Sequence, residues 1–162
     1  LKMSYSKISF KTVIRIMNWW PPYFGAGVRV KLLDENSLKI KVSMPLRKLN
    51  SNYVGVHFGG SLYSMCDPFY MFMLIQQLRD DHIVWDKAAF IDFIRPGKGT
   101  VRAHFKLDLK EVEDIKKQAL ENFSVQPKFE CEITDEKGDV VARLEKHLYV
   151  RRKDAKKRFS KS

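Results

Sequence analysis

One segment of the chain combines residue types that could polarise a carbonyl group and activate water. It runs from Asn52 to Asp67, fifteen positions apart, and contains the adjacent pair Gly59 and Gly60. If a helix begins at the two glycines, its first amides lack intrahelical partners, and a carbonyl oxygen can approach them closely because no side chain intervenes. The partial positive charge at a helix N-terminus adds to this effect. The segment therefore predicts an oxyanion hole formed by the amides of Gly59 and Gly60.

Asp67 is the second chemical component of this segment. A helix that begins at Gly59 would place Asp67 two turns along the apolar run from Leu62 to Ile75. A carboxylate is costly in such surroundings unless it is paired or functional. Beside an activated carbonyl group, Asp67 could direct a water molecule or attack the carbonyl carbon itself. The competing interpretation is a structural acid bonded to a loop amide or to Arg95.

The elements in the first half of the chain can be predicted from hydrophobic periodicity. A helical spacing of apolar residues predicts a helix over residues 6–20, which Pro21-Pro22 would end. Two strands are predicted next, at 27–33 and 38–44. Apolar and polar residues alternate in the second of them, so one of its faces should be buried and the other exposed to solvent. The segment 59–78 is apolar almost all round, which predicts a buried helix at the centre of the domain.

The second half of the chain is predicted to be mostly β-strand. Strands are expected at 87–95, 101–109, 129–133 and 140–150, and a charged helix at 111–122. The turn Pro96-Gly97-Lys98-Gly99 is predicted to join the first two of these strands as a hairpin. Antiparallel hairpins dominate this order, which predicts an α+β protein. A curved antiparallel sheet wrapped around a long buried central helix, the hot-dog fold, with an extra N-terminal helix, satisfies the pattern.

Bulk properties limit the class of protein. The 162 residues, 44% of them hydrophobic, predict a single domain over 1–162. No window reaches the roughly 18 uncharged apolar residues of a membrane span, and no secretory signal is visible. Cys66 and Cys131 have no Cys or His neighbour at metal-ligand spacing, so we expect no metal site and reduced thiols in a cytoplasmic protein.

The net charge of +11 is concentrated at the C-terminus. The basic tail, residues 151–162, contains seven Lys or Arg residues and one Asp. Such a tail is usually a solvated, frayed end, although it could also touch nucleic acid, anionic lipid or a protein partner. Because the recognition motifs of common nucleic-acid binders are absent, we expect no specific nucleic-acid partner.

The segment from Asn52 to Asp67 resembles the hot-dog thioesterases, specifically the phenylacetyl-CoA thioesterase type. That pattern has an Asn, a His-Gly-Gly that opens the central helix, and an Asp fifteen residues after the Asn. The resemblance covers residues 25–151, including the stretches 94–99 and 135–142, and is closest to an uncharacterised branch, a domain of unknown function.

The resemblance implies a role for each matched residue. Asp67 would be the base or nucleophile, Asn52 would help to position water, and the amides of Gly59 and Gly60 would hold the carbonyl oxygen. The site would lie between the subunits of a homodimer, with a tetramer as a further option, so that Asp67 faces the helix end of its partner. The substrate would be an acyl-CoA thioester, and no cofactor is expected beyond the coenzyme A of the substrate itself.

Five further residues are candidates for substrate binding: His57, Phe58, Ser61, Arg95 and Lys98. The first three adjoin the glycines, and the two cations could meet the phosphates of coenzyme A or could be ordinary surface charges.

Two departures from the family pattern support a second hypothesis. Phe58 stands where the family has His, with His57 one place earlier, and Pro68 follows Asp67 directly and should kink the helix. The alternative function is therefore a non-catalytic acyl or acyl-CoA-binding module on the same fold.

Overall fold

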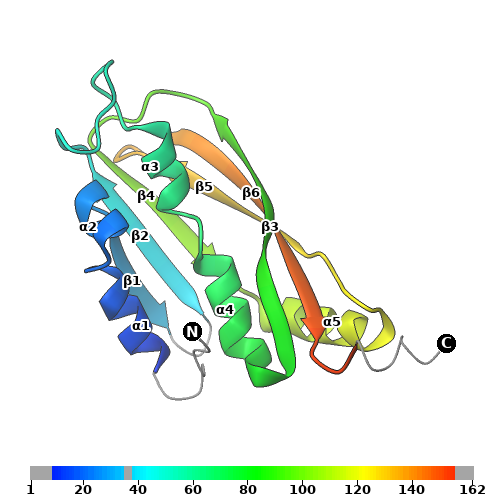
Figure 1. Cartoon of the computed structure of the whole chain (residues 1–162). Helices are drawn as coiled ribbons and strands as arrows, with labels where there is room; N and C mark the ends of the chain where they lie inside the picture. Colours follow the sequence, from blue (N-terminus) through cyan, green and yellow to red (C-terminus); the bar gives the residue numbers. More distant parts are fainter. Residues whose placement is uncertain (1–8, 35–37, 156–162) are drawn as a thin grey trace.

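A computed structural model describes residues 9–34 and 38–155, which form a curved antiparallel sheet around a central helical segment (Figure 1). The six strands lie in the order β1-β2-β4-β5-β6-β3. Their bounds are β1 Arg29–Asp34, β2 Lys39–Pro45, β3 His82–Phe93, β4 Thr100–Lys106, β5 Lys128–Thr134 and β6 Val140–Arg152. The helices are α1 Phe10–Met17, α2 Pro21–Ala26, α3 Gly59–Ser64, α4 Phe69–Leu78 and α5 Leu109–Glu121, with a short 3-10 turn, η1, at Arg79–Asp81. The predicted hot-dog arrangement with an extra N-terminal helix is confirmed.

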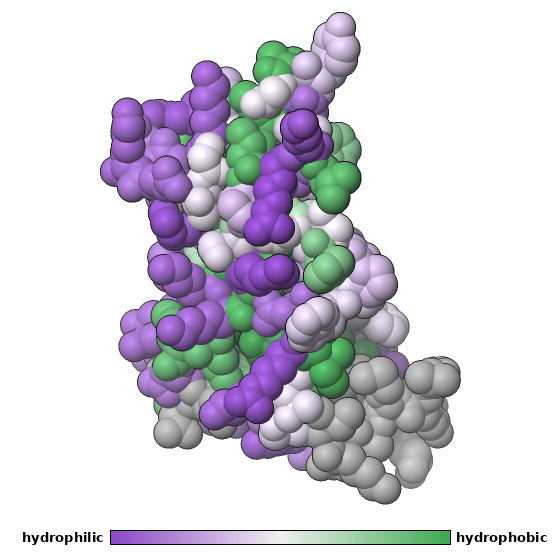
Figure 2. Space-filling view, turned by 90° about the vertical axis from the view of Figure 1, so that its left-hand side faces the viewer, coloured by the Kyte–Doolittle hydropathy of each residue, from purple (hydrophilic) through white to green (hydrophobic). Residues whose placement is uncertain are grey.

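The N-terminal region is two helices rather than one. Helix α1 buries Phe10, Ile14 and Met17 at the predicted helical spacing, while residues 6–8 of the predicted helix lie outside the described residues. The proline pair does not lead directly into a strand as we expected. Pro21 opens helix α2, where the missing amide hydrogen of proline costs nothing. The side of the molecule that carries α1 and α2 presents a mixture of hydrophilic and apolar side chains (Figure 2).

Asn18, just after α1, closes the outer edge of strand β1. Its side-chain amide donates to the carbonyl of Val30 (3.1 Å), and its carbonyl oxygen accepts from the Val30 amide (2.8 Å). An exposed strand edge would otherwise invite pairing with another chain. The β1 end of the sheet is therefore protected within the subunit.

The buried central helix is interrupted next to Asp67. Helix α3 ends at Ser64, a turn occupies residues 65–68, and α4 begins at Phe69. Pro68 cannot donate a backbone hydrogen bond to Ser64, and the Ser64 carbonyl accepts instead from the Tyr23 hydroxyl (3.0 Å) and from the Asp67 amide (3.4 Å). The predicted kink at Pro68 is confirmed, and the break exposes part of the Asp67 side chain.

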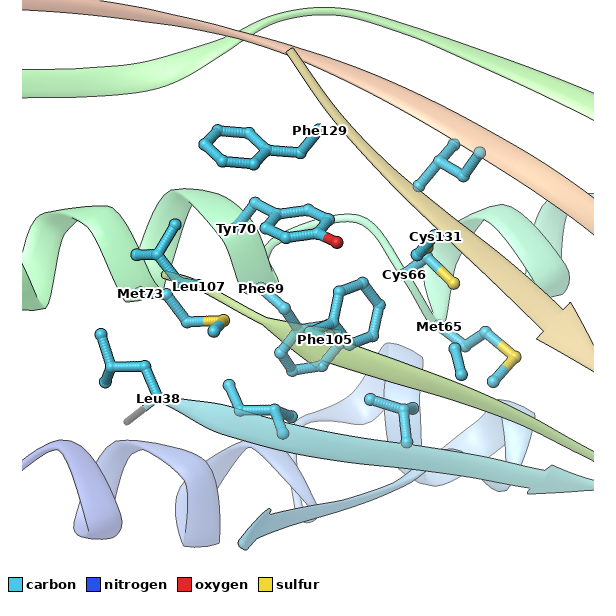
Figure 3. Close-up of a cluster of buried hydrophobic side chains, with 14 of the residues drawn as sticks. Leu38, Met65, Cys66, Phe69, Tyr70, Met73, Phe105, Leu107, Phe129 and Cys131 are labelled. Carbon is cyan, nitrogen blue, oxygen red and sulfur yellow. The ribbon is translucent and has the colours of Figure 1, made fainter. Parts of the chain in front are cut away.

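The core lies between α4 and the inner face of the sheet (Figure 3). Phe69 packs against Phe105 of β4 with ring centroids 4.9 Å apart, and Tyr70 stacks on Phe129 of β5 at 4.6 Å. Within the described residues, no helix is long and apolar enough to cross a membrane.

The predicted hairpin at residues 96–99 is wrong. Strand β3 pairs with β6, whereas β4 pairs with β2 and β5. The turn carbonyls bond to the segment that leads to α3: Gly97 accepts from the His57 amide (3.1 Å) and Gly99 from the Leu46 amide (2.8 Å). These hydrogen bonds hold residues 94–99 against the loop before α3. The crossover between β3 and β4 therefore lies close to the start of α3.

Candidate functional site

A hollow of about 410 Å³ surrounds the start of α3. Four of the residues predicted from the sequence line it together: Asn52, His57, Gly59 and Arg95. Its other walls are mainly apolar, including Phe93 at the end of β3. The crossover at residues 94–99 therefore brings residues far apart in the sequence into one concave site, as a small-molecule site requires.

Asn52 shapes the loop on one side of this hollow. The side-chain oxygen of Asn52 accepts hydrogen bonds from the backbone amides of Val54 (3.0 Å) and Val56 (3.2 Å). The backbone amide of Asn52 donates to the Val56 carbonyl (2.8 Å). These bonds fold the loop in the manner of an Asx turn. Since the side-chain oxygen is committed to the loop, the side-chain NH2 group is the part of Asn52 available to a ligand.

His57 forms a buried wall of the hollow, with 3% of its surface exposed. Burial lowers the pKa of the imidazole, and the bond to the Gly99 carbonyl opposes this effect only in part. Nε2 lies 3.0 Å from that carbonyl oxygen, which requires the hydrogen to reside on Nε2. Nδ1 is then a buried acceptor, and it has no hydrogen-bond partner in the described part of the chain. His57 therefore carries a buried acceptor for which the described residues supply no donor.

The two glycines are needed because aromatic rings fill the space beside them. A β-carbon at Gly59 would lie 3.0 Å from Cζ of Phe93, and one at Gly60 would lie 2.4 Å from Cε1 of Phe58. The first amides to bond within α3 are those of Ser61 and Leu62, both to the Phe58 carbonyl. The amides of Gly59 and Gly60 precede them and have no intrahelical acceptor. Because α3 has six residues, its dipole contributes less than a long helix would.

Asp67 does not line this hollow but belongs to a buried charged cluster. Its Oδ1 accepts from the Tyr63 hydroxyl (2.6 Å) and from the Lys146 ammonium (2.5 Å). The same ammonium lies 3.3 Å from Oδ1 of Asp86 on β3. The Lys146 side chain is 1% exposed, whereas that of Asp67 is 40% exposed. Asp67 therefore has a buried cation on one side and access to a ligand on the other.

The pKa values in the cluster follow from burial and from these contacts. Burial lowers the pKa of Lys146, but the bonds to Asp67 and the charge of Asp86 outweigh it, so that the net shift is upward. Burial raises the pKa of Asp86, an effect that Lys146 opposes. Lys146 is thus a permanent ammonium at neutral pH, held between two acids.

Sequence reasoning missed Lys146, Tyr63 and Asp86. One signal could have revealed Lys146. It lies between Leu144 and Leu148 in the inward-facing row of β6, and from Val140 to Val150 the other side chains of that row are apolar. A charged residue in such a row predicts a buried partner.

The predicted alternative pairing of Asp67 with Arg95 is wrong. Arg95 forms a salt bridge with Asp139 (2.9 Å), in which both side chains are about half exposed. Lys98 is exposed on the neighbouring turn, Phe58 is exposed, and Ser61 is half-buried within α3. Of these four residues, Arg95 lines the hollow, while Phe58, Ser61 and Lys98 are close in sequence to residues that line it.

A second hollow, of about 690 Å³, lies among the outward-facing side chains of β3 to β6. It contains Asp92, whose position the sequence left open, and the salt bridge between Glu132 and Arg143 (2.9 Å). Neither a helix N-terminus nor a residue of the predicted site lines it. Its chemistry is that of a solvated, charged sheet face.

Comparison with known proteins identifies the family. A family model described as a domain of unknown function, DUF4442, matches residues 9–150. The chain belongs to the DUF4442 family. No curated protein matches the sequence.

Solved structures share the fold of this DUF4442 protein at low sequence identity. PA5026 from Pseudomonas aeruginosa, a probable thioesterase of unknown function, superposes with a TM-score of 0.74 at 22% identity, covering 87% of this chain and 95% of that one. The thioesterase HI1161 from Haemophilus influenzae gives 0.65 at 15% identity, covering 93% and 96%. The PaaI protein from the E. coli phenylacetic acid degradation operon gives 0.57 at 17% identity, covering 87% and 95%. The DUF4442 chain therefore has the fold of the hot-dog thioesterases.

Proposed function

We propose that this DUF4442 protein hydrolyses acyl-CoA thioesters. The observation that carries the proposal is the position of Gly59. Its amide opens α3 inside a hollow with Asn52 and has no hydrogen-bond partner among the described residues, while Asp67, in the turn after α3, keeps a partly exposed carboxylate. These are the two elements that thioester hydrolysis requires, a site for the developing oxyanion and a group that activates water.

The proposed reaction uses these groups in a simple order. The amides of Gly59 and Gly60 bind the thioester carbonyl oxygen. Asp67 takes a proton from a water molecule, positioned with the help of Asn52, as the water oxygen attacks the carbonyl carbon. The tetrahedral intermediate then collapses, the carbon–sulfur bond breaks, and the thiolate of coenzyme A leaves and takes up a proton. In the alternative route the Asp67 carboxylate attacks the carbonyl carbon and displaces the thiolate of coenzyme A, and water then hydrolyses the resulting acyl–Asp67 anhydride to release the acid and restore the carboxylate.

The proposed site is completed by a second copy of the chain. Asp67 does not line the hollow of its own subunit, so one chain supplies the two elements in separate places. Strand β3 ends the sheet, and within the described residues its outer edge has no partner. This edge strand is twelve residues long and exposes Trp85, Phe90 and Phe93. Long apolar edges of this kind pair with another chain, and two β3 strands related by a two-fold axis would join the sheets of a homodimer.

Substrate binding would use the mouth of the hollow. The acyl-CoA would pass His57, Phe58 and Ser61, and the phosphates of coenzyme A would meet Arg95 and Lys98. Arg95 already has Asp139 as a partner, so its contribution would require an exchange of that salt bridge for a phosphate. The reaction needs no cofactor apart from the coenzyme A of the substrate, and we expect it to take place in the cytoplasm.

The function is tested by thiol release from acyl-CoA esters with short, long and aromatic acyl groups, with the mass of the native protein measured in parallel. We expect a dimer that releases coenzyme A from at least one class of ester. Absence of thiol release across the panel would contradict hydrolysis.

An acyl-CoA-binding module is the second candidate. It is favoured by Phe58, which stands where the phenylacetyl-CoA thioesterase pattern has His, and by the tight pairing of Asp67 with Lys146. It predicts thermal stabilisation by the same esters without turnover.

A further inference from the structure

We propose that Lys146 and Tyr63 are positioning residues that hold one oxygen of Asp67 and leave its other oxygen for the reacting water. The inference rests on the proposed function of Asp67 and names two residues that the family pattern between Asn52 and Asp67 does not include as functional.

The geometry of the two contacts supports this assignment. Both the Tyr63 hydroxyl (2.6 Å) and the Lys146 ammonium (2.5 Å) reach the same oxygen, Oδ1. Within the described residues, no hydrogen bond reaches Oδ2. Two donors on one oxygen fix the plane and direction of a carboxylate, and a fixed base loses less free energy on reaching its reactive geometry. Because the Asp67 side chain is 40% exposed, Oδ2 is open to a ligand or to water.

Burial of Lys146 argues for a role beyond packing. The lysine lies on β6 in the row of Leu144 and Leu148, with 1% of its side chain exposed. A buried ammonium loses its hydration, and an apolar residue of similar volume at such a site is often neutral or stabilising. A position that served packing alone would therefore suit leucine or methionine better than lysine.

Asp86 explains how the ammonium is retained. It lies on β3, 3.3 Å from Nζ, so the cation bridges the strand that ends the sheet and the turn between α3 and α4. The Tyr63 ring, 5.4 Å from Nζ, covers another side of the cation. The edge strand proposed to meet the second subunit is thus connected through one lysine to the proposed catalytic carboxylate.

The remaining titratable groups around Asp67 are uncharged. Burial raises the pKa of the Cys66 thiol and of the Tyr23 hydroxyl, and burial together with the bond to Asp67 raises that of Tyr63. The charged members of the cluster are therefore Asp67, Asp86 and Lys146. Replacing the ammonium by a neutral side chain would remove the positive charge that opposes the upward pKa shift of Asp86, so that Asp86 would take up a proton at higher pH than in the wild type.

The test is the pH profile of thiol release by Lys146→Met, which removes the charge and keeps an unbranched side chain. We expect kcat to fall by roughly 100-fold with little change in KM, because a misplaced base affects the transition state more than substrate binding. The acid limb of the kcat profile should move to higher pH. Lys128→Met is the matched control, because Lys128 is an exposed lysine on the adjacent strand whose partner is Glu145 (3.5 Å), and it should keep the wild-type kcat and profile.

Tyr63→Phe is the second variant, because it removes one hydroxyl group and keeps the ring. It should lower kcat by roughly 10-fold without moving the acid limb as far as Lys146→Met, since the ammonium remains. Wild-type kcat and profile in a folded Lys146→Met protein would overturn the inference, and if that variant does not fold, wild-type kcat in Tyr63→Phe would do so. Loss of thiol release in the wild type itself is a different result, which refutes the proposed function and the inference with it.

Discussion

Asp67→Asn is expected to lower kcat for acyl-CoA hydrolysis by about 100- to 10,000-fold, the range that a general base contributes. The change keeps the size of the side chain and can still accept the Tyr63 hydrogen bond, but it removes the negative charge that would take a proton from water. Steady-state thiol release measured at several pH values checks the prediction. KM should change less than kcat, because Asp67 acts on the reacting water and not on coenzyme A.

Asp114→Asn provides the control for this prediction. Asp114 is an exposed acid on α5, away from the residues of the hollow and of the charged cluster. Its loss should leave kcat unchanged. An Asp67→Asn protein that retains wild-type kcat while remaining folded would remove Asp67 from the proposed mechanism.

Phe69→Ala is expected to lower the free energy of unfolding by about 3–5 kcal/mol. Phe69 is fully buried at the start of α4, where its ring contacts Phe105 (4.9 Å between centroids) and Tyr23 (6.4 Å). Removing the ring leaves a cavity between α4 and the sheet, next to the turn that carries Asp67. Urea unfolding at a fixed protein concentration measures the change.

Leu49→Ala is the comparison, since Leu49 is an apolar residue with 87% of its surface exposed, outside the proposed subunit contact. Its substitution should change the free energy of unfolding by no more than about 0.5 kcal/mol. Equal effects of the two substitutions would contradict the central position of α4 in the core.

Most of the fold could be predicted from the sequence because its elements are set by local patterns. The alternation in residues 38–44 and the apolar stretch 59–78 specify a half-buried strand and a buried helix without reference to the rest of the chain. The pairing of β3 with β6 could not be read in this way. Pro96-Gly97-Lys98-Gly99 has the composition of a hairpin turn, but its carbonyls bond to the loop before α3, a contact between distant parts of the sequence.

The same distinction between local patterns and contacts of distant segments applies to the candidate site. The Asn52–Asp67 spacing and the glycines lie in one continuous segment, and Asn52 and Gly59 line one hollow in the structure. The contacts of Asp67 with Lys146 and of Lys146 with Asp86 join the turn after α3 to β6 and β3, so no local pattern contains them. The break at Pro68 was predicted, but the hydrogen bond from the Tyr23 hydroxyl to the Ser64 carbonyl was not, because Tyr23 lies 41 positions away in the sequence.

A hydrolytic site shared between two subunits can be tested with a mixed dimer of two inactive variants. Asp67→Asn removes the base, and Gly59→Val would obstruct the hollow, because a side chain there meets Phe93. Each variant alone should form an inactive dimer. Co-expressed in equal amounts, they should recover about a quarter of the wild-type thiol release, because half of the dimers are mixed and each mixed dimer contains one intact shared site. No recovery from folded, mixed dimers would rule out a site shared between the subunits.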